Sequence, residues 1–271
     1  GLLKITAQTS FIKMVVEAMG SNLTSEVSKE WQDRLASNPF IFKPNAEKLA
    51  IFNAIINASF IRPPSSFYNG AAQYFAGKTN WSEWQELGIQ GIADLASRLD
   101  QDDNQQHLIN ALPHLPQQPL QSLAICLEHQ PQINTELAEA IAKQATLELQ
   151  AGHQENTILL LRALSSAPAV GIIKRLLEEQ FCSDLIHNVH WYVGITGRVW
   201  SILEDETLLN RFLEALANNH AALFPQLFAD LVAIPSLRDK VLKQLRLPAR
   251  SPALTEAIGV LFSNVTNDQG T

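Results

Sequence analysis

The chain has 271 residues, of which 20 are Lys or Arg and 27 are Asp or Glu, so the formal net charge is −7. A chain of this length can form one large domain, two smaller ones or an elongated repeat array. A net negative charge argues against a general nucleic-acid binder, because affinity for polyanions depends on basic side chains. No apolar stretch is long enough to cross a bilayer and no signal peptide is recognisable. Two cysteines are too few for a disulfide framework, so we expect a cytoplasmic protein that binds neither membranes nor nucleic acid.

Leu and Ala make up about a quarter of the chain, and β-branched residues seldom alternate with polar ones. Apolar residues recur instead at intervals of three and four, which indicates helices. We therefore predict an all-α fold of about 14 to 16 helices, either a HEAT- or armadillo-like α-solenoid or an irregular helical stack. In chain order, the expected helices cover residues 3–19, 25–37, 45–61, 65–77, 82–99, 102–112, 118–129, 134–151, 154–165, 168–180, 183–203, 206–218, 220–234, 236–246 and 251–263.

Several expected helices begin with recognisable capping residues. Ser65 or Ser66 is expected to cap the helix at 65–77, and Ser82 with Gln85 has the spacing of a capping box. In the second half, Asp205 can cap the helix at 206–218.

Two further starts lie near the end of the chain. Ser236 with Asp239 makes an acidic variant of the capping box, and Ser251 before Pro252 provides an N-cap and a first helical residue.

Gly88 and Gly91 fall on one face of the expected helix at 82–99. Each glycine costs about 1 kcal/mol of helix propensity. We therefore expect the backbone of a neighbouring helix to approach this face closely.

The acidic stretch 100–104 is the clearest candidate boundary in the chain. It divides the chain into an N-terminal helical region, residues 1–100, and a repeat-like region, residues 101–271, which pack either separately or as one continuous domain. A Leu/Ala pattern recurs in the second region at residues 108–112, 160–164 and 212–216. This 52-residue spacing indicates either a genuine repeat or a chance match in a Leu/Ala-rich chain.

Parts of the sequence resemble a known family. They are the stretch Leu87–Ala96, the run Gly197–Trp200 and the tail from Phe212 to Phe262. Together they are similar to an uncharacterised all-helical family of gammaproteobacteria, a domain of unknown function, over nearly the whole chain. The resemblance implies a bacterial cytoplasmic setting and an additional segment before residue 1, in keeping with the missing initiator Met. It implies no activity, substrate or cofactor.

Cys182, Asp184, His187 and His190 place possible metal ligands within nine residues. Zinc prefers four such ligands in a tetrahedral arrangement. The spacing matches no strong zinc signature, so we interpret these as ordinary surface or packed side chains and expect neither a metal nor a cofactor.

The densest aromatic group consists of Trp191, Tyr192 and Trp200, with glycines between its members and Arg198 beside it. One interpretation is core packing, in which the glycines admit a neighbouring helix. The other is an anchor for a partner, because aromatic and Arg side chains dominate binding hot spots. Trp191 and Arg198 are therefore candidate partner-binding residues.

Residues 238–250 include five basic side chains but only one acidic side chain. Basic residues near a helix C-terminus also suit the helix dipole. The alternative is a docking strip for an acidic partner, with the candidate residues Lys240, Lys243, Arg246 and Arg250.

No P-loop, GxGxxG, GxSxG, HExxH or CxxC motif is present, so we assign no catalytic residue. Two hypotheses remain for this sequence of unknown function. The first is a non-enzymatic helical scaffold that binds a protein or peptide. The second is an enzyme or small-molecule binder whose dispersed site a single sequence does not reveal. A continuous groove would favour the first, and a deep enclosed polar pocket the second.

Overall fold

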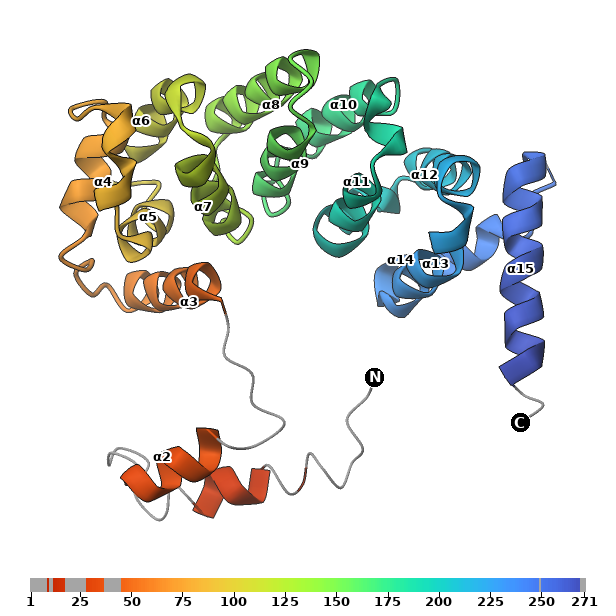
Figure 1. Cartoon of the computed structure of the whole chain (residues 1–271), viewed down its shortest axis with the longest axis horizontal. Coiled ribbons are helices and arrows are strands. Elements are labelled where there is room, and N and C mark those ends of the chain that lie inside the picture. Colours follow the sequence, from red (N-terminus) through yellow and green to blue (C-terminus); the bar gives the residue numbers. More distant parts are fainter. Residues whose placement is uncertain (1–8, 10–11, 18–27, 37–44, 249, 269–271) are drawn as a thin grey trace. The chain divides into compact units, whose positions relative to one another are not determined.

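The computed structural model describes residues 9, 12–17, 28–36, 45–248 and 250–268 of the chain (Figure 1). The chain divides into two compact units, residues 1–45 and 46–271. In the first unit, residues 12–17 are helical and α2 covers Lys29–Ala36. Most of the helix expected at 3–19 lies outside the described residues.

The second unit consists of helices throughout its described part, and no described residue of the chain lies in a strand. This confirms the all-α, multi-helical fold class. The α-helices are α3 (Ala46–Ser59), α4 (Tyr68–Phe75), α5 (Ile89–Ala96), α6 (Asn104–Ala111), α7 (Gln117–Leu127), α8 (Thr135–Gln150), α9 (Gln154–Ala163), α10 (Val170–Gln180), α11 (Val189–Gly194), α12 (Glu206–Asn219), α13 (Phe224–Ala233), α14 (Pro235–Gln244) and α15 (Pro252–Asp268). The shorter helices are η1 (Trp81–Glu86), η2 (Leu112–His114), η3 (Asp184–His187), the π-helix η4 (Ile195–Val199), η5 (Trp200–Glu204) and η6 (Ala221–Leu223).

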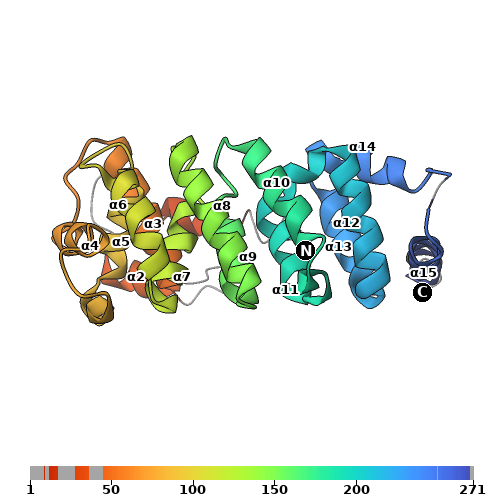
Figure 2. The same ribbon diagram turned by 90° about the horizontal axis from the view of Figure 1, so that it is seen from above.

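Most of these helices form two layers. In one layer α3, α5, α7, α9 and α11 contact one another in turn, and in the other α4, α6, α8 and α10 do so (Figure 1). Contacts between α4 and α5 and between α8 and α9 join the layers. Seen from above, α12 and α13 follow α10 and α11 along the same row (Figure 2). Each helix therefore buries an apolar face against a few near neighbours, as stacked helices require.

One contiguous apolar core runs through the second unit from Ala50 to Ile258. Helices α4 and α5 contact α6 and α7 across the acidic stretch 100–104. Both expected regions therefore contribute to the same core. None of the helices in the described part of the chain combines the length and the apolar character needed to span a bilayer.

The leucine-rich pattern at 108–112, 160–164 and 212–216 begins in α6, α9 and α12. Helix α6 lies in the same layer as α8, whereas α9 lies in the layer of α7. The 52-residue spacing thus connects helices in different layers rather than equivalent positions of the stack.

Two of the expected caps are confirmed. The Asp205 carboxylate accepts the backbone N–H groups of Thr207 and Leu208 at the start of α12. The Ser251 hydroxyl accepts the N–H of Leu254 at the start of α15, with Pro252 at the first helical position. These side chains satisfy donors that a helix N-terminus leaves unpaired.

The other expected caps are wrong. The N-cap residue of α4 is Phe67, so the helix is capped by neither Ser65 nor Ser66. The N-cap residue of α14 is Ile234, so Ser236 does not cap that helix. Asn80, not Ser82, caps η1. Pro235 explains the shift at α14, because its fixed φ and missing N–H suit the first helical position.

The single helix expected at 82–99 is broken in two. Leu87 and Gly88 are extended, with ψ of 118° and 131°, between η1 and α5. A close approach is present at the glycines, but it comes from Phe67, the residue before α4, and not from the body of a neighbouring helix. A Cβ on Gly91 would lie 2.5 Å from the Phe67 carbonyl oxygen, and one on Gly88 would lie 2.9 Å from the Phe67 ring. Backbone proximity therefore explains why position 91 is glycine, and the Phe67 ring occupies the space beside Gly88.

The prediction of one continuous helix at 183–203 is also wrong. This segment consists of η3, α11, the π-helix η4 and η5 in succession. A π-helix places an additional residue in a turn and often occurs at functional sites.

We predict that Gly91→Ala lowers the free energy of unfolding by about 2–3 kcal/mol, because the new methyl group displaces the Phe67 backbone. Gly70→Ala is a matched control in α4, since no atom lies within 4 Å of the point that its Cβ would occupy. It should leave stability unchanged or raise it by up to about 1 kcal/mol. Urea unfolding followed by circular dichroism measures both, and equal effects of the two substitutions would contradict the prediction.

Candidate functional site

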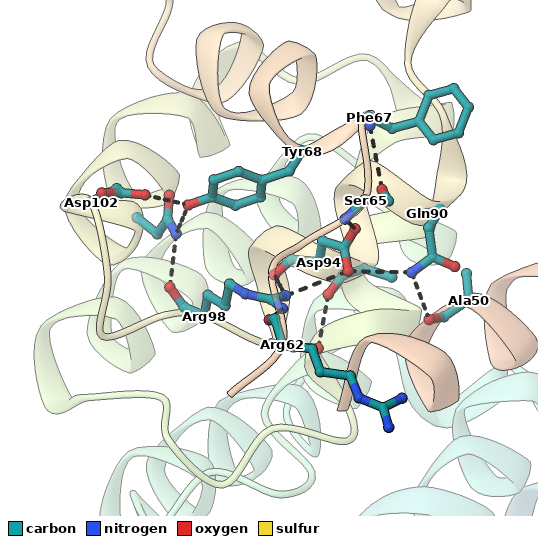
Figure 3. A network of polar contacts seen from close by, with 12 residues as sticks. Ala50, Arg62, Ser65, Phe67, Tyr68, Gln90, Asp94, Arg98 and Asp102 are labelled. Atoms are coloured by element: carbon teal, nitrogen blue, oxygen red, sulfur yellow. Dashed lines mark hydrogen bonds and ion pairs between the residues drawn. The ribbon is translucent and has the colours of Figure 1, made fainter. Parts of the chain in front are cut away.

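Two networks that join Arg side chains to a buried carboxylate are candidates for a site. The first centres on Asp94 in α5 (Figure 3). Its carboxylate accepts the Ser65 N–H at 2.9 Å and pairs with the Arg98 guanidinium at 3.4 Å. Arg98 also donates to the Arg62 carbonyl oxygen at 3.1 Å. These contacts fix the segment between α3 and α4 against α5.

The same network continues to the start of α6. Asn104 donates to the Arg98 carbonyl oxygen at 2.7 Å and to the Tyr68 hydroxyl at 3.0 Å. That hydroxyl donates in turn to Asp102 (Figure 3). The side chains of Asp94 and Arg98 are 0% and 3% exposed. A network closed from solvent to this degree stabilises the fold and offers nothing to a ligand.

The second network centres on Glu128, directly after α7, whose side chain is 1% exposed. Arg162 of α9 donates to one carboxylate oxygen from Nε at 3.2 Å and Nη2 at 2.9 Å. Arg198 of the π-helix η4 places Nε 3.3 Å from the other oxygen. His129 lies 3.3 Å from that same oxygen. One carboxylate therefore joins three successive elements of a single layer.

The pKa of Glu128 reflects this environment. Burial by itself raises the pKa of a carboxyl group. The close approach of His129, together with the charges and hydrogen bonds of Arg162 and the charge of Arg198, outweighs burial, so the pKa of Glu128 lies below its ordinary value. Glu128 is consequently ionised at neutral pH, and two guanidinium groups share its single negative charge.

Helix α11 and η4 present two different faces. Trp191, Tyr192 and Ile195 are fully buried in the core. The opposite face lines a cavity of about 390 Å³ with residues at helical spacing, namely His190, Val193, Gly194, Gly197 and Arg198, opposite Ile158 and Arg162 of α9. The periodicity that buries one face thus also assembles the site.

The two glycines of this face differ in their surroundings. A Cβ on Gly197 would meet no atom within 4 Å, and one on Gly194 would lie 3.4 Å from Ile158. The expectation that a helix approaches these glycines closely is therefore wrong for Gly197. A glycine inside a helix costs stability, and here the missing side chains contribute volume to the cavity.

The arginines keep unused donors at this cavity. Arg198 uses Nε toward Glu128 and Nη1 toward the Gly197 carbonyl oxygen. Arg162 uses Nε and Nη2. No hydrogen bond within the described part of the chain occupies Nη2 of Arg198 or Nη1 of Arg162. The guanidinium groups therefore present N–H donors to a hollow with apolar walls, formed by Ile158 and Val193.

The sequence-predicted partner residues lie in different surroundings. Arg198 is 39% exposed and lines the cavity. Trp191 is 0% exposed, and its indole N–H donates to Gln180 at 2.7 Å. Its ring packs edge-on against Phe181 and Tyr192. Trp191 is thus a core side chain that lies outside the cavity lining and is not accessible to a partner.

Most of the basic strip near the C-terminus has partners within the chain. Lys243 contacts both carboxylate oxygens of Glu206, and Lys240 donates to the Glu204 carbonyl oxygen. Arg250 donates to the Leu245 carbonyl oxygen, while Arg246 is exposed. The structure does not gather these four residues with Arg198 into one site.

The possible metal ligands are not assembled either. Cys182 is an exposed free thiol that accepts a contact from Arg211 at 3.3 Å. Within the described ranges, no three His, Cys, Asp or Glu side chains are grouped as a metal site requires. His190 lines the cavity beside Arg198.

Sequence reasoning did not identify Glu128 or Arg162. They are 34 residues apart, and neither lies in a motif. The sequence offered one signal for this site, the apolar and basic residues between 189 and 199, which we interpreted mainly as core packing. That α9 lies opposite them follows only from the fold.

The comparisons with known proteins define the family. The model of the family described as "Protein of unknown function (DUF3549)" matches residues 1–262, so the chain belongs to this family of all-helical proteins. No curated protein and no solved structure matches the chain significantly. The family carries no activity or ligand that could be transferred to the cavity.

We predict that Glu128→Gln lowers the free energy of unfolding at pH 7 by about 1–3 kcal/mol, because two arginines lose their shared carboxylate. The folded-state pKa of Glu128 is below the unfolded value of about 4.3. Its charge therefore stabilises the protein above that pH, and the contribution is lost as the pH falls through the folded pKa. The variant should show a shallower loss of stability on acidification.

Urea unfolding between pH 3 and pH 7 measures this difference. Glu139→Gln is the control, since Glu139 pairs with Arg175 at an exposed position and such pairs contribute about 0–1 kcal/mol. An unchanged pH dependence in Glu128→Gln would contradict the assignment of Glu128.

Proposed function

We propose that the protein is a non-enzymatic helical scaffold of the bacterial cytoplasm, which binds a segment of another protein in the cavity between α9 and α11. The observation that carries this proposal is the cavity of about 390 Å³, with apolar walls and unused arginine donors. Binding sites in proteins combine apolar lining with a few placed polar groups in this way.

The form of the cavity favours a protein segment over a small molecule. His190, Val193, Gly197 and Arg198 of its lining are exposed, so the cavity opens to solvent. Small-molecule sites usually enclose most of their ligand. An open hollow of this size suits one or two side chains of a longer chain, whose remaining residues contact the neighbouring helices of the layer.

The free cysteines are consistent with the proposed cytoplasmic location. Cys126 and Cys182 are both free, as is usual in a reducing compartment. Burial raises the pKa of the Cys126 thiol to about 12, so it stays protonated and unreactive.

A photo-cross-linking residue at position 193 tests the proposal in cells that naturally contain the protein. Val193 is 48% exposed at the cavity, and Val170 of α10, 61% exposed and outside the cavity lining, is the matched control. We expect a discrete cross-linked partner peptide at 193, identified by mass spectrometry and absent at 170. Adducts at 193 no stronger than those at 170 would contradict the proposed function.

A further inference from the structure

The partner segment that occupies the cavity can be described by its chemistry. We propose that the cavity binds a carboxylate of this segment, either an Asp or Glu side chain or the carboxyl end of the chain, between Arg198 and Arg162. This inference rests on the proposed function, because it specifies the ligand of the same site.

The charges of the site favour an anion as the ligand. Arg162 and Arg198 contribute two positive charges, and Glu128 neutralises one of them. None of the described residues that line the cavity is acidic. One positive charge therefore remains without a partner in a hollow bounded by low-dielectric apolar groups. Guanidinium groups bind carboxylates through charge-assisted, often paired hydrogen bonds.

The donor geometry suits a carboxylate. Both guanidinium groups are held by the same Glu128 side chain, at 2.9 Å from Arg162 and 3.3 Å from Arg198. Glu128 thereby holds both guanidinium groups in place before a ligand arrives. Preorganised donors lose little conformational entropy on binding, which raises affinity.

A single net positive charge distinguishes a carboxylate from other anions. Nucleic acid and multiply charged phosphates are bound by several basic groups. Here one charge is left over, and the whole chain carries a net charge of −7. Ile158 and Val193 provide apolar contact beside the charge, which suits an amino-acid side chain or chain end.

The space for this ligand comes from Gly197. No atom lies within 4 Å of where its Cβ would be. A larger side chain at 197 should therefore fill the cavity without a clash and exclude the ligand, while both arginines remain in place.

Isothermal titration calorimetry with three N-acetylated hexapeptides of Ala, Ser and Leu tests the inference. The first has a free carboxyl end, the second is amidated and contains one Glu, and the third is amidated with Gln in place of Glu. We expect one of the two carboxylate peptides to bind at least tenfold more tightly than the Gln peptide. The tighter of the two identifies the source of the carboxylate.

Variants separate recognition from folding. Arg198→Gln and Gly197→Leu should each weaken carboxylate binding at least tenfold, whereas Arg175→Gln, which removes an exposed charge on α10, should not. Thermal melting verifies that each variant is folded. The inference would be overturned if neither carboxylate peptide bound more tightly than the Gln peptide, or if Arg198→Gln and Arg175→Gln had equal effects. The cross-link at position 193 would stand independently of that result.

Discussion

The candidate site depends on one buried carboxylate. Glu128 ends α7, and its side chain holds Arg162 of α9 and Arg198 of η4 at the same point. Ser165 and Ser166 donate to its backbone oxygen, so the turn after α9 is fixed there as well. Because a buried charge must be compensated, these elements cannot shift past one another without a large cost. The interaction therefore sets the spacing of three successive elements in one layer.

The two arginine–carboxylate networks show how similar chemistry can serve different ends. Around Asp94, one arginine meets one carboxylate, both are buried, and further hydrogen bonds complete the network. Around Glu128, two arginines meet one carboxylate, and both retain contact with solvent. The Asp94–Arg98 pair is balanced in charge and buried. The network at Glu128 leaves one charge and several donors available, which is the physical basis for assigning binding to this site.

The helical fold was predictable from the sequence because apolar periodicity and composition are local properties. Helices α3, α8 and α12 lie within two residues of their expected bounds. The break at Gly88 was not predictable, since it depends on the approach of Phe67 from another segment. The π-helix η4 was missed for a similar reason, because its residues fit a regular helical pattern.

The site was only partly predictable. Arg198 was recognised as a candidate, but Trp191 beside it belongs to the core. Adjacent residues of a helix face different directions, and the sequence does not say which face meets the neighbouring layer. Glu128 and Arg162 come together only through the contacts of α7 with α9. Charge compensation of this kind is a property of the fold and has no local motif.

Side-chain nitrogen NMR of the arginines tests the central claim most directly. The spectra of the ¹⁵N-labelled protein are recorded during titration with the hexapeptide that carries a free carboxylate. The account predicts that the guanidinium resonances of Arg198 and Arg162 shift with saturation, while those of Arg175 and the buried Arg98 stay in place. A uniform shift of exposed arginines, or none at Arg198, would contradict it.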